Sequence, residues 1–156
     1  MTPGSEPTIR PATLADLPRI EQLEADCFGE DRFTRAQLRY LLTKANCTPL
    51  ALDLEGRLVG SAFMLWRKGS RVGRLFSIAI DGRIRGKGLG AFLLTACEQA
   101  AIKRGCRTIS LEVRADNKAA IGLYKRFGYQ ITGDLPGYYA DGANGLAMRK
   151  SLAPFK

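Results

Sequence analysis

The chain has 156 residues, of which 46% are apolar and 25% are charged, a composition typical of soluble globular proteins. It contains no long apolar run, so we expect no membrane span and a cytoplasmic location. Because the chain has no histidine, it cannot use Ser/His or Cys/His nucleophilic catalysis, and four cysteines at no metal-like spacing predict no metal site. The net charge of +9 attracts polyanions, whether a nucleotide cofactor, a nucleic acid or an acidic protein.

The distribution of residues along the chain predicts one domain. Residues 1–7 lack the basic and apolar segments of a targeting signal, so we expect a short disordered leader there and a single domain over residues 8–156. Basic residues are spread along the chain, with no long run and no interleaved aromatics. A nucleic acid is therefore not expected as a partner.

The first part of the domain predicts one short strand and two helices. The strand is expected over residues 8–10, and apolar residues then recur at helical spacing over residues 14–27. A second helix is predicted to begin at a capping box formed by Thr34 and Gln37. Pro49 is expected to end the connection that follows this helix.

The remainder predicts a strand meander followed by alternating helices and strands. Strands are expected at 50–54, 58–66, 74–81, 107–113, 129–132 and 146–152. Helices are expected at 90–104, with Phe92, Leu93 and Cys97 facing the core, and at 118–127. This order predicts an α/β fold, a three-layer α/β/α sandwich around a mixed, mostly antiparallel sheet.

A basic, glycine-rich turn joins a predicted strand to a predicted helix. Its residues are Arg85, Gly86, Lys87, Gly88, Leu89 and Gly90. Glycines let backbone N–H groups approach an anion closely, and the basic side chains and the helix N-terminus add positive charge. The P-loop and dinucleotide-binding fingerprints are both absent. The turn is therefore either a phosphate-binding site or a flexible connection with solvated charges.

The spacing Arg85-x-x-Gly88-x-Gly90 resembles the acetyl-CoA-binding turn of the GNAT acetyltransferase superfamily. The resemblance covers nearly the whole domain and implies acetyl-CoA as co-substrate, bound by the turn residues 85–90. In this family the strand before the turn separates from its neighbour, and its backbone pairs with the pantetheine arm. By position the resemblance assigns that contact to Ile78, Ala79 and Ile80, which otherwise would form an ordinary buried strand.

The stretch LEVRADNKAAIGLYKRFGY closely resembles the corresponding part of bacterial ribosomal-protein alanine N-acetyltransferases. The resemblance implies that Glu112 is the general base, acting through water, that Tyr124 protonates the departing CoA thiolate, and that Asn117 contacts the cofactor. From the residues alone, Glu112 could face solvent, Tyr124 could be a core tyrosine and Asn117 could simply cap a helix. A phenol of pKa ~10 can give a proton to a thiolate whose conjugate acid lies near ~8.5 if the site holds them together.

The stretch Tyr138 to Gly142 resembles the tyrosine-bearing loop of peptide N-terminal acetyltransferases. The resemblance implies that Tyr138 and Tyr139 frame the first residues of a peptide, although both could also pack a hairpin. The chain departs from the family at Ala143 and Asn144, where acidic residues often follow the glycine.

Three functional hypotheses follow from the sequence. The first is an N-acetyltransferase that moves an acetyl group from acetyl-CoA to a protein N-terminal α-amine, of a ribosomal protein for example, by direct attack and without a metal. The second keeps the chemistry and changes the acceptor to a lysine side chain or a small amine. The third is a CoA-sensing or nucleic-acid-binding module with the same fold and no turnover.

Overall fold

The computed structural model describes residues 6–84 and 86–152, so Arg85 and most of the expected leader lie outside the described residues. The described residues form seven strands, four α-helices and three short 3-10 turns. In chain order they are β1 (Thr8–Pro11), η1 (Leu14–Asp16), α1 (Leu17–Phe28), η2 (Gly29–Asp31), α2 (Arg35–Thr43), β2 (Cys47–Leu54), β3 (Arg57–Leu65), β4 (Val72–Ile80), η3 (Gly82–Ile84), α3 (Leu89–Lys103), β5 (Thr108–Arg114), α4 (Lys118–Arg126), β6 (Gln130–Leu135) and β7 (Gly145–Ser151).

The seven strands form one mixed sheet in the order β1-β2-β3-β4-β5-β7-β6. Every neighbouring pair is antiparallel except β4 and β5, which run parallel and are joined by α3. Glu55 and Gly56 both have positive φ, the geometry of a two-residue hairpin turn between β2 and β3. The predicted mixed, mostly antiparallel sheet is confirmed.

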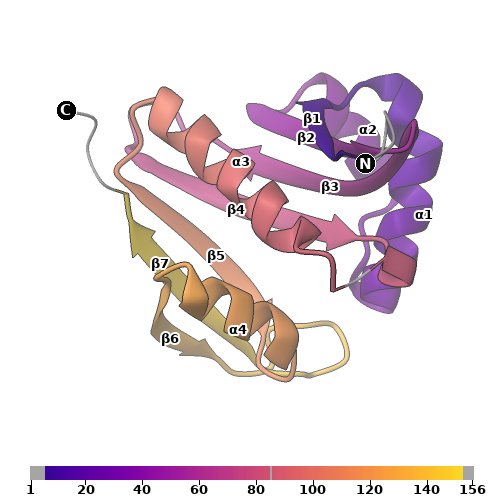
Figure 1. Ribbon diagram of the computed structural model, residues 1–156. Helices are drawn as coiled ribbons and strands as arrows, with labels where there is room; N and C mark the ends of the chain where they lie inside the picture. Colours follow the sequence, from indigo (N-terminus) through magenta and orange to yellow (C-terminus); the bar gives the residue numbers. More distant parts are fainter. Residues whose placement is uncertain (1–5, 85, 153–156) are drawn as a thin grey trace.

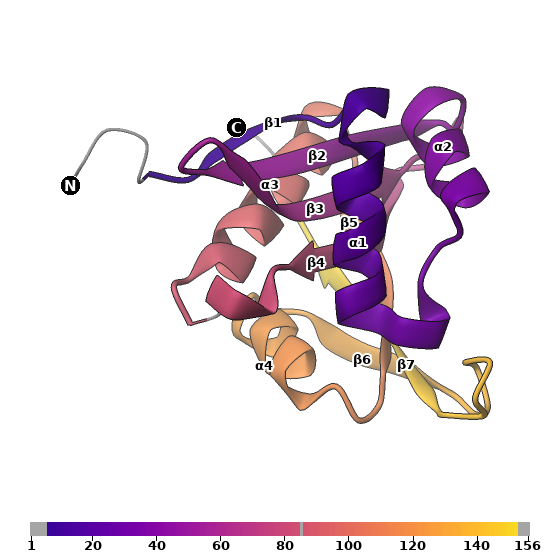
Figure 2. The same ribbon diagram turned by 90° about the vertical axis from the view of Figure 1, so that its right-hand side faces the viewer.

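The helices cover the sheet on two faces. Helices α1 and α2 lie on one face, while α3 and α4 lie on the other (Figures 1 and 2). The α1/α2 face buries a smaller apolar cluster that includes Ile20, Leu38 and Phe63. The predicted three-layer sandwich is therefore confirmed, and each face of the sheet has its own core.

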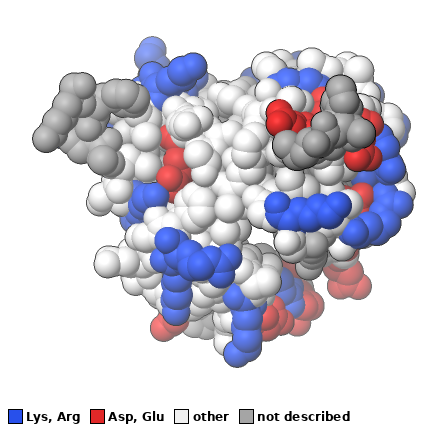
Figure 3. Space-filling model, in the orientation of Figure 1, with Lys and Arg blue, Asp and Glu red and all other residues white. Residues whose placement is uncertain are grey.

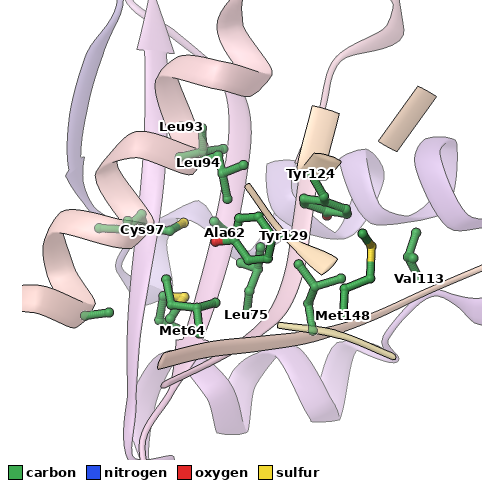
Figure 4. Close-up of a cluster of buried hydrophobic side chains, with 14 of the residues drawn as sticks. Ala62, Met64, Leu75, Leu93, Leu94, Cys97, Val113, Tyr124, Tyr129 and Met148 are labelled. Carbon is green, nitrogen blue, oxygen red and sulfur yellow. The ribbon is translucent and has the colours of Figure 1, made fainter. Parts of the chain in front are cut away.

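The larger core lies between the sheet and the helices α3 and α4 (Figure 4). Leu93, Leu94 and Cys97 of α3 pack there against Leu75 of β4. These side chains are fully or almost fully buried, and complete burial of a leucine contributes about 1.5–3 kcal/mol to stability. Tyr124 belongs to this core as well, which ties α4 to the rest of the sheet.

Two sequence predictions about local packing are wrong. Phe92 is 40% exposed, because the buried stripe of α3 runs through Leu89, Leu93 and Leu94 instead. Pro49 lies inside β2 and pairs with Phe63 of β3. The Pro49 carbonyl points toward β1 and accepts a hydrogen bond of 2.9 Å from the backbone N–H of Ala12, the residue after the end of β1. The N–H that proline lacks would point to this same side, so its absence removes no hydrogen bond between the strands of the sheet.

Strands β4 and β5 pair over only four residues each. Their register runs from Val72 opposite Thr108 to Leu75 opposite Leu111. Beyond these positions β4 continues to Ile80 with β3 as its neighbour, and β5 continues to Arg114 with β7 as its neighbour. Within the described strands the sheet is therefore open between the last residues of β4 and β5.

Thr34 should contribute measurably to stability through its helix cap. The Thr34 hydroxyl accepts a bond from Gln37 N at 3.1 Å, and the Gln37 side chain accepts from Thr34 N at 2.8 Å. Thr34→Ala should therefore lower the free energy of urea unfolding by about 1 kcal/mol. Thr43→Ala, which removes only an exposed bond to the Arg39 carbonyl, should change it by less than about 0.5 kcal/mol. Equal effects of the two substitutions would refute the capping role.

Candidate active site

Two cavities meet at the opening between β4 and β5. The first, here called the glycine-turn cavity, has a volume of about 330 Å³ and is lined by the end of β4, the glycine-rich turn and α4. The second, here called the tyrosine-loop cavity, has a volume of about 260 Å³ and lies between the α1–α2 connection, β5 and the loop that carries Tyr138. They share five lining residues, which are Phe28, Ile78, Asn117, Ala120 and Tyr124.

The glycine-rich turn forms one end of the glycine-turn cavity. Gly86 and Gly88 have φ of +85° and +75°, and among the described residues other than their chain neighbours no atom lies within 4 Å of a Cβ built on either one. Gly88 is the N-cap of α3, so the first N–H groups of this 15-residue helix have no partner within it. Leu89 is buried and Gly90 also lines the cavity, whereas Lys87 is exposed and is absent from its lining.

Asp81 holds the entrance to the turn in place. Its carboxylate accepts bonds from Arg19 Nη2 at 2.9 Å and from the backbone and side chain of Arg83 at 2.9 and 2.8 Å. These bonds, that to Arg83 foremost, hold the pKa of Asp81 well below its usual range. The end of β4 is thereby fixed to α1.

The wall of the glycine-turn cavity comes from β4 and α4. Ile78, Ala79 and Ile80 all line it, on the part of β4 that has no partner in β5. Asn117 caps α4, its Oδ1 accepting a bond from Ala120 N at 3.2 Å, as the sequence allows. Arg126 is the one charged side chain among the described residues of this wall.

Glu112 lines the tyrosine-loop cavity. Strand alternation buries Leu111 and Val113 on the α3/α4 side and turns Glu112 to the opposite face, where its side chain is 21% exposed. Its carboxylate is paired with Arg74, whose guanidinium also lies 4.9 Å from the ring centre of Phe76. Glu112 is therefore half-buried and ion-paired, and it faces the cavity instead of the open solvent that the sequence left as an alternative.

Tyr124 lies where the two cavities meet. It is 5% exposed and its ring centre lies 5.6 Å from that of Tyr129. Tyr124 is therefore a core tyrosine, as the sequence allowed. It also lines both cavities. Burial raises its pKa well above the usual value of a phenol, so the hydroxyl stays protonated at neutral pH.

The tyrosine loop closes the other end of its cavity. Tyr138 is 47% exposed, and its ring meets that of Tyr139 edge-on at 5.1 Å. Arg114 of β5 pairs with Asp141 of this loop at 2.8 Å and with Asp31 of η2 at 2.6 Å. One guanidinium thus connects the two segments that frame the cavity.

Comparison with known proteins identifies the family. The family model described as the acetyltransferase (GNAT) family matches residues 17–129 of the chain. The chain belongs to the GNAT family and is an N-acetyltransferase. The predicted family and enzyme class are confirmed, and members of this family use acetyl-CoA.

Relatives across bacteria and eukaryotes match most of the chain. It is 35% identical to the N-alpha-acetyltransferase RimI of Mycobacterium tuberculosis, with 96% of both chains covered. It is 34% identical to the catalytic subunit NAA10 of the Arabidopsis thaliana N-terminal acetyltransferase A complex, covering 92% of this chain and 77% of that protein. Among solved structures, the ribosomal-protein-S18-alanine N-acetyltransferase of Escherichia coli superposes with a TM-score of 0.86 at 26% identity, over 97% of both chains.

Three polar residues of this GNAT site were not predicted from the sequence. They are Arg74, which pairs with Glu112, Arg114, which joins the loops, and Glu24, which is 1% exposed on the floor of the tyrosine-loop cavity. Glu24 accepts a bond from the Ser77 hydroxyl at 2.8 Å. A signal for it exists, because Glu24 follows Ile20 by four residues and so lies on the apolar stripe of α1.

Two further findings concern metal ligands and membrane-spanning helices in the described part of the chain. Among residues 6–84 and 86–152, no three His, Cys, Asp or Glu side chains form a group that could hold a metal ion. In the same part of the chain, no helix has the length and apolar character needed to span a bilayer.

Glu24 should make the stability of the protein depend on pH. Burial raises the pKa of its carboxyl, so the folded state binds this proton more tightly than the unfolded state. The stabilisation is complete below the unfolded value of about 4.3 and is lost as the pH rises through the folded pKa. The free energy of unfolding of the wild type, measured relative to Glu24→Gln, should therefore fall between pH ~4 and neutrality.

The control for this measurement is Glu30→Gln, which changes an exposed glutamate of η2. The difference between wild type and Glu24→Gln should change more with pH than the difference between wild type and Glu30→Gln. A pH-independent difference for Glu24→Gln would show that burial leaves the Glu24 carboxyl unperturbed.

Proposed function

We propose that the protein transfers the acetyl group of acetyl-CoA to the N-terminal α-amine of a protein. The observation that carries the proposal is the junction of the two cavities at Tyr124, with Glu112 on one side of it and the glycine-rich turn on the other. An acceptor amine and a thioester entering from opposite cavities would meet at this junction.

Acetyl-CoA supplies an acyl group activated as a thioester, and the glycine-turn cavity is suited to hold it. Gly86 and Gly88 leave room for a phosphate and Gly90 lines the same cavity, while the N-terminus of α3 provides N–H groups and a positive dipole end. Arg85, outside the described residues, and Lys87 would add positive charge. Ile78, Ala79 and Ile80 offer an unpaired strand edge along which an extended arm can bind, and Asn117 lies beside it.

Glu112 is proposed as the general base. Its position in the tyrosine-loop cavity allows it to take a proton from the acceptor amine through one water molecule. Arg74 holds the carboxylate in one orientation. The chain has no histidine to act as the base. Glu112 lines the cavity and is also the residue to which the family resemblance assigns this role.

Tyr124 is proposed as the general acid that protonates the departing thiolate. Because burial keeps its phenol neutral, the proton is available when the carbon–sulfur bond breaks. The same burial makes the phenol a weaker acid, at a cost of about 1.4 kcal/mol for each pKa unit. The enzyme must therefore hold the phenol and the sulfur in direct contact for the transfer to be fast.

Protein N-termini are the proposed acceptors, for two reasons. Relatives that cover most of the chain include N-alpha-acetyltransferases and the S18-alanine enzyme, and Tyr138 and Tyr139 border the cavity. In addition, an α-amine with a pKa of ~7.7–8.0 is about one-tenth neutral at pH 7, whereas lysine at ~10.4 is neutral in under about one part in a thousand. A weak carboxylate base can therefore deprotonate an N-terminal α-amine more easily than a lysine side chain.

Gly88→Glu should abolish binding of acetyl-CoA. In the wild type, acetyl-CoA should raise the melting temperature by linkage, and the variant should lose this shift because its side chain would crowd and repel the pyrophosphate. Gly56→Glu is the matched control, since Gly56 has φ of +76° in an open turn and does not line the cavity. Both variants incur the same left-handed backbone strain. A folded Gly88→Glu protein with a normal shift would rule out this binding site.

Tyr124→Phe should lower kcat by about 10²-fold and change the binding of acetyl-CoA little. Tyr129→Phe is its control: Tyr129 is buried beside Tyr124 but lines neither cavity, and its hydroxyl donates to Glu98 at 2.9 Å. Glu112→Gln should lower kcat to a similar extent, with partial recovery at high pH where the amine loses its proton unaided. Unchanged turnover in both Tyr124→Phe and Glu112→Gln would leave only packing roles for these residues.

A further inference from the structure

Six exposed basic side chains gather at the end of the sheet opposite the junction of the cavities. Three come from the turn between β3 and β4, and three from the end of α3 and the loop before β5. We call this group the sheet-end patch, and its members are Arg67, Lys68, Arg71, Lys103, Arg104 and Arg107.

Backbone and ring contacts make the patch one continuous surface. Arg107 N donates to Arg71 O at 2.8 Å, which joins the two segments side by side. The Arg104 guanidinium lies 4.7 Å from the ring centre of Trp66, directly before the turn. Lys and Arg are visible at the upper left of the molecule, over the C-terminal end of α3 (Figure 3).

The charge of the patch is not neutralised. The segments 66–71 and 103–108 contain no Asp or Glu, and within the part of the chain that the structure describes none of the six side chains forms a salt bridge. By contrast, Arg74 and Arg114 near the cavities are both paired with carboxylates. A cluster of like charges costs stability through repulsion unless an anion binds it.

The patch is too distant to act in acetyl transfer. It lies at the start of β4, whereas Ile80 at the end of this nine-residue strand lines the glycine-turn cavity. At about 3.3 Å per residue the two places are about 25 Å apart. The charge therefore serves something other than binding of acetyl-CoA.

We propose that the sheet-end patch binds the phosphate backbone of a nucleic-acid duplex. Four of its six members are arginines, whose forked donors match phosphate oxygens. The two segments expose no apolar side chain, since Trp66 and Cys106 are only 8% and 9% exposed. The surface thus has no side chain that could insert into a membrane or stack on exposed bases. It is suited to bind the phosphate backbone of a duplex without sequence specificity.

The sequence does not reveal this surface because its basic residues form two short runs 30 or so residues apart. Each run alone is an ordinary solvated turn. The parallel crossover through α3 brings the two runs to one end of the sheet. The inference is independent of the proposed acceptor, since it concerns a different end of the molecule.

The test compares two triple variants of equal charge. Arg67→Gln/Arg71→Gln/Arg107→Gln changes the patch, and Arg39→Gln/Arg57→Gln/Lys125→Gln changes three exposed basic residues outside the patch that line neither cavity. Binding to fluorescent RNA and DNA duplexes of about 20 base pairs is measured by anisotropy over a range of salt concentrations. The patch variant should bind at least about tenfold more weakly, with the salt slope reduced by about 2–3, and the control should lose less than about threefold.

Acetyl transfer to peptides should be unchanged in both variants, which shows that they are folded. Equal weakening of both variants would mean that only the net charge attracts nucleic acid, and no binding by the wild type near ~0.1 M salt would likewise overturn the proposal. Two further probes cover other anions. The patch could bind polyglutamate or vesicles rich in phosphatidylserine while the protein binds neither duplex. That result would identify an acidic protein or a membrane as the partner and would refute the inference.

Discussion

The short parallel pairing of β4 and β5 is the constraint on which the site depends. The two strands pair only as far as Leu75 and Leu111, and each then follows a different neighbour. This opening leaves a strand edge without a partner in β5 and lets two cavities meet inside a sheet that otherwise has a continuous core. Had the pairing continued to Ile80, side chains would fill the junction and neither cavity would reach Tyr124.

Ion pairs fix the segments around this opening, where apolar packing is interrupted. Asp81 ties the end of β4 to α1 through Arg19, and Arg114 ties the tyrosine loop to the α1–α2 connection through Asp141 and Asp31. Isolated pairs at a surface contribute little to stability. These pairs share partners and are half-buried, so they act mainly by restricting the loops that frame the site. The basic residues of the sheet-end patch have no such partners, and this contrast separates them from the charges that maintain the fold.

The fold was predictable from the sequence because short local patterns indicate most of its helices, strands and turns. The capping box at Thr34, the turn at Glu55 and Gly56, and the apolar periodicity of α1 all correspond to observed boundaries. The Phe92 prediction failed because α3 is apolar on most of its surface, so periodicity alone does not identify the buried side.

The site could be predicted only in part. Glu112, Tyr124, Tyr138 and the glycine-rich turn follow from the resemblance to the GNAT family, and the structure places them around one junction. The roles of Arg74 and Arg114 could not be found in this way, because the carboxylates that these arginines join to their own strands, Glu112, Asp31 and Asp141, lie 27 to 83 residues away. Such contacts arise from the register of the sheet, which local patterns do not encode.

The measurement that tests the account most directly is a competition between acceptor amines. Peptides with a free N-terminus and no lysine, N-terminally blocked peptides with one lysine, and polyamines are incubated together with the protein and acetyl-CoA, and mass spectrometry follows each product over time. We expect free N-termini to be acetylated first and Tyr138→Ala to raise KM for the peptide more than KM for acetyl-CoA. Acetylation of lysines or polyamines with free N-termini untouched would contradict this expectation.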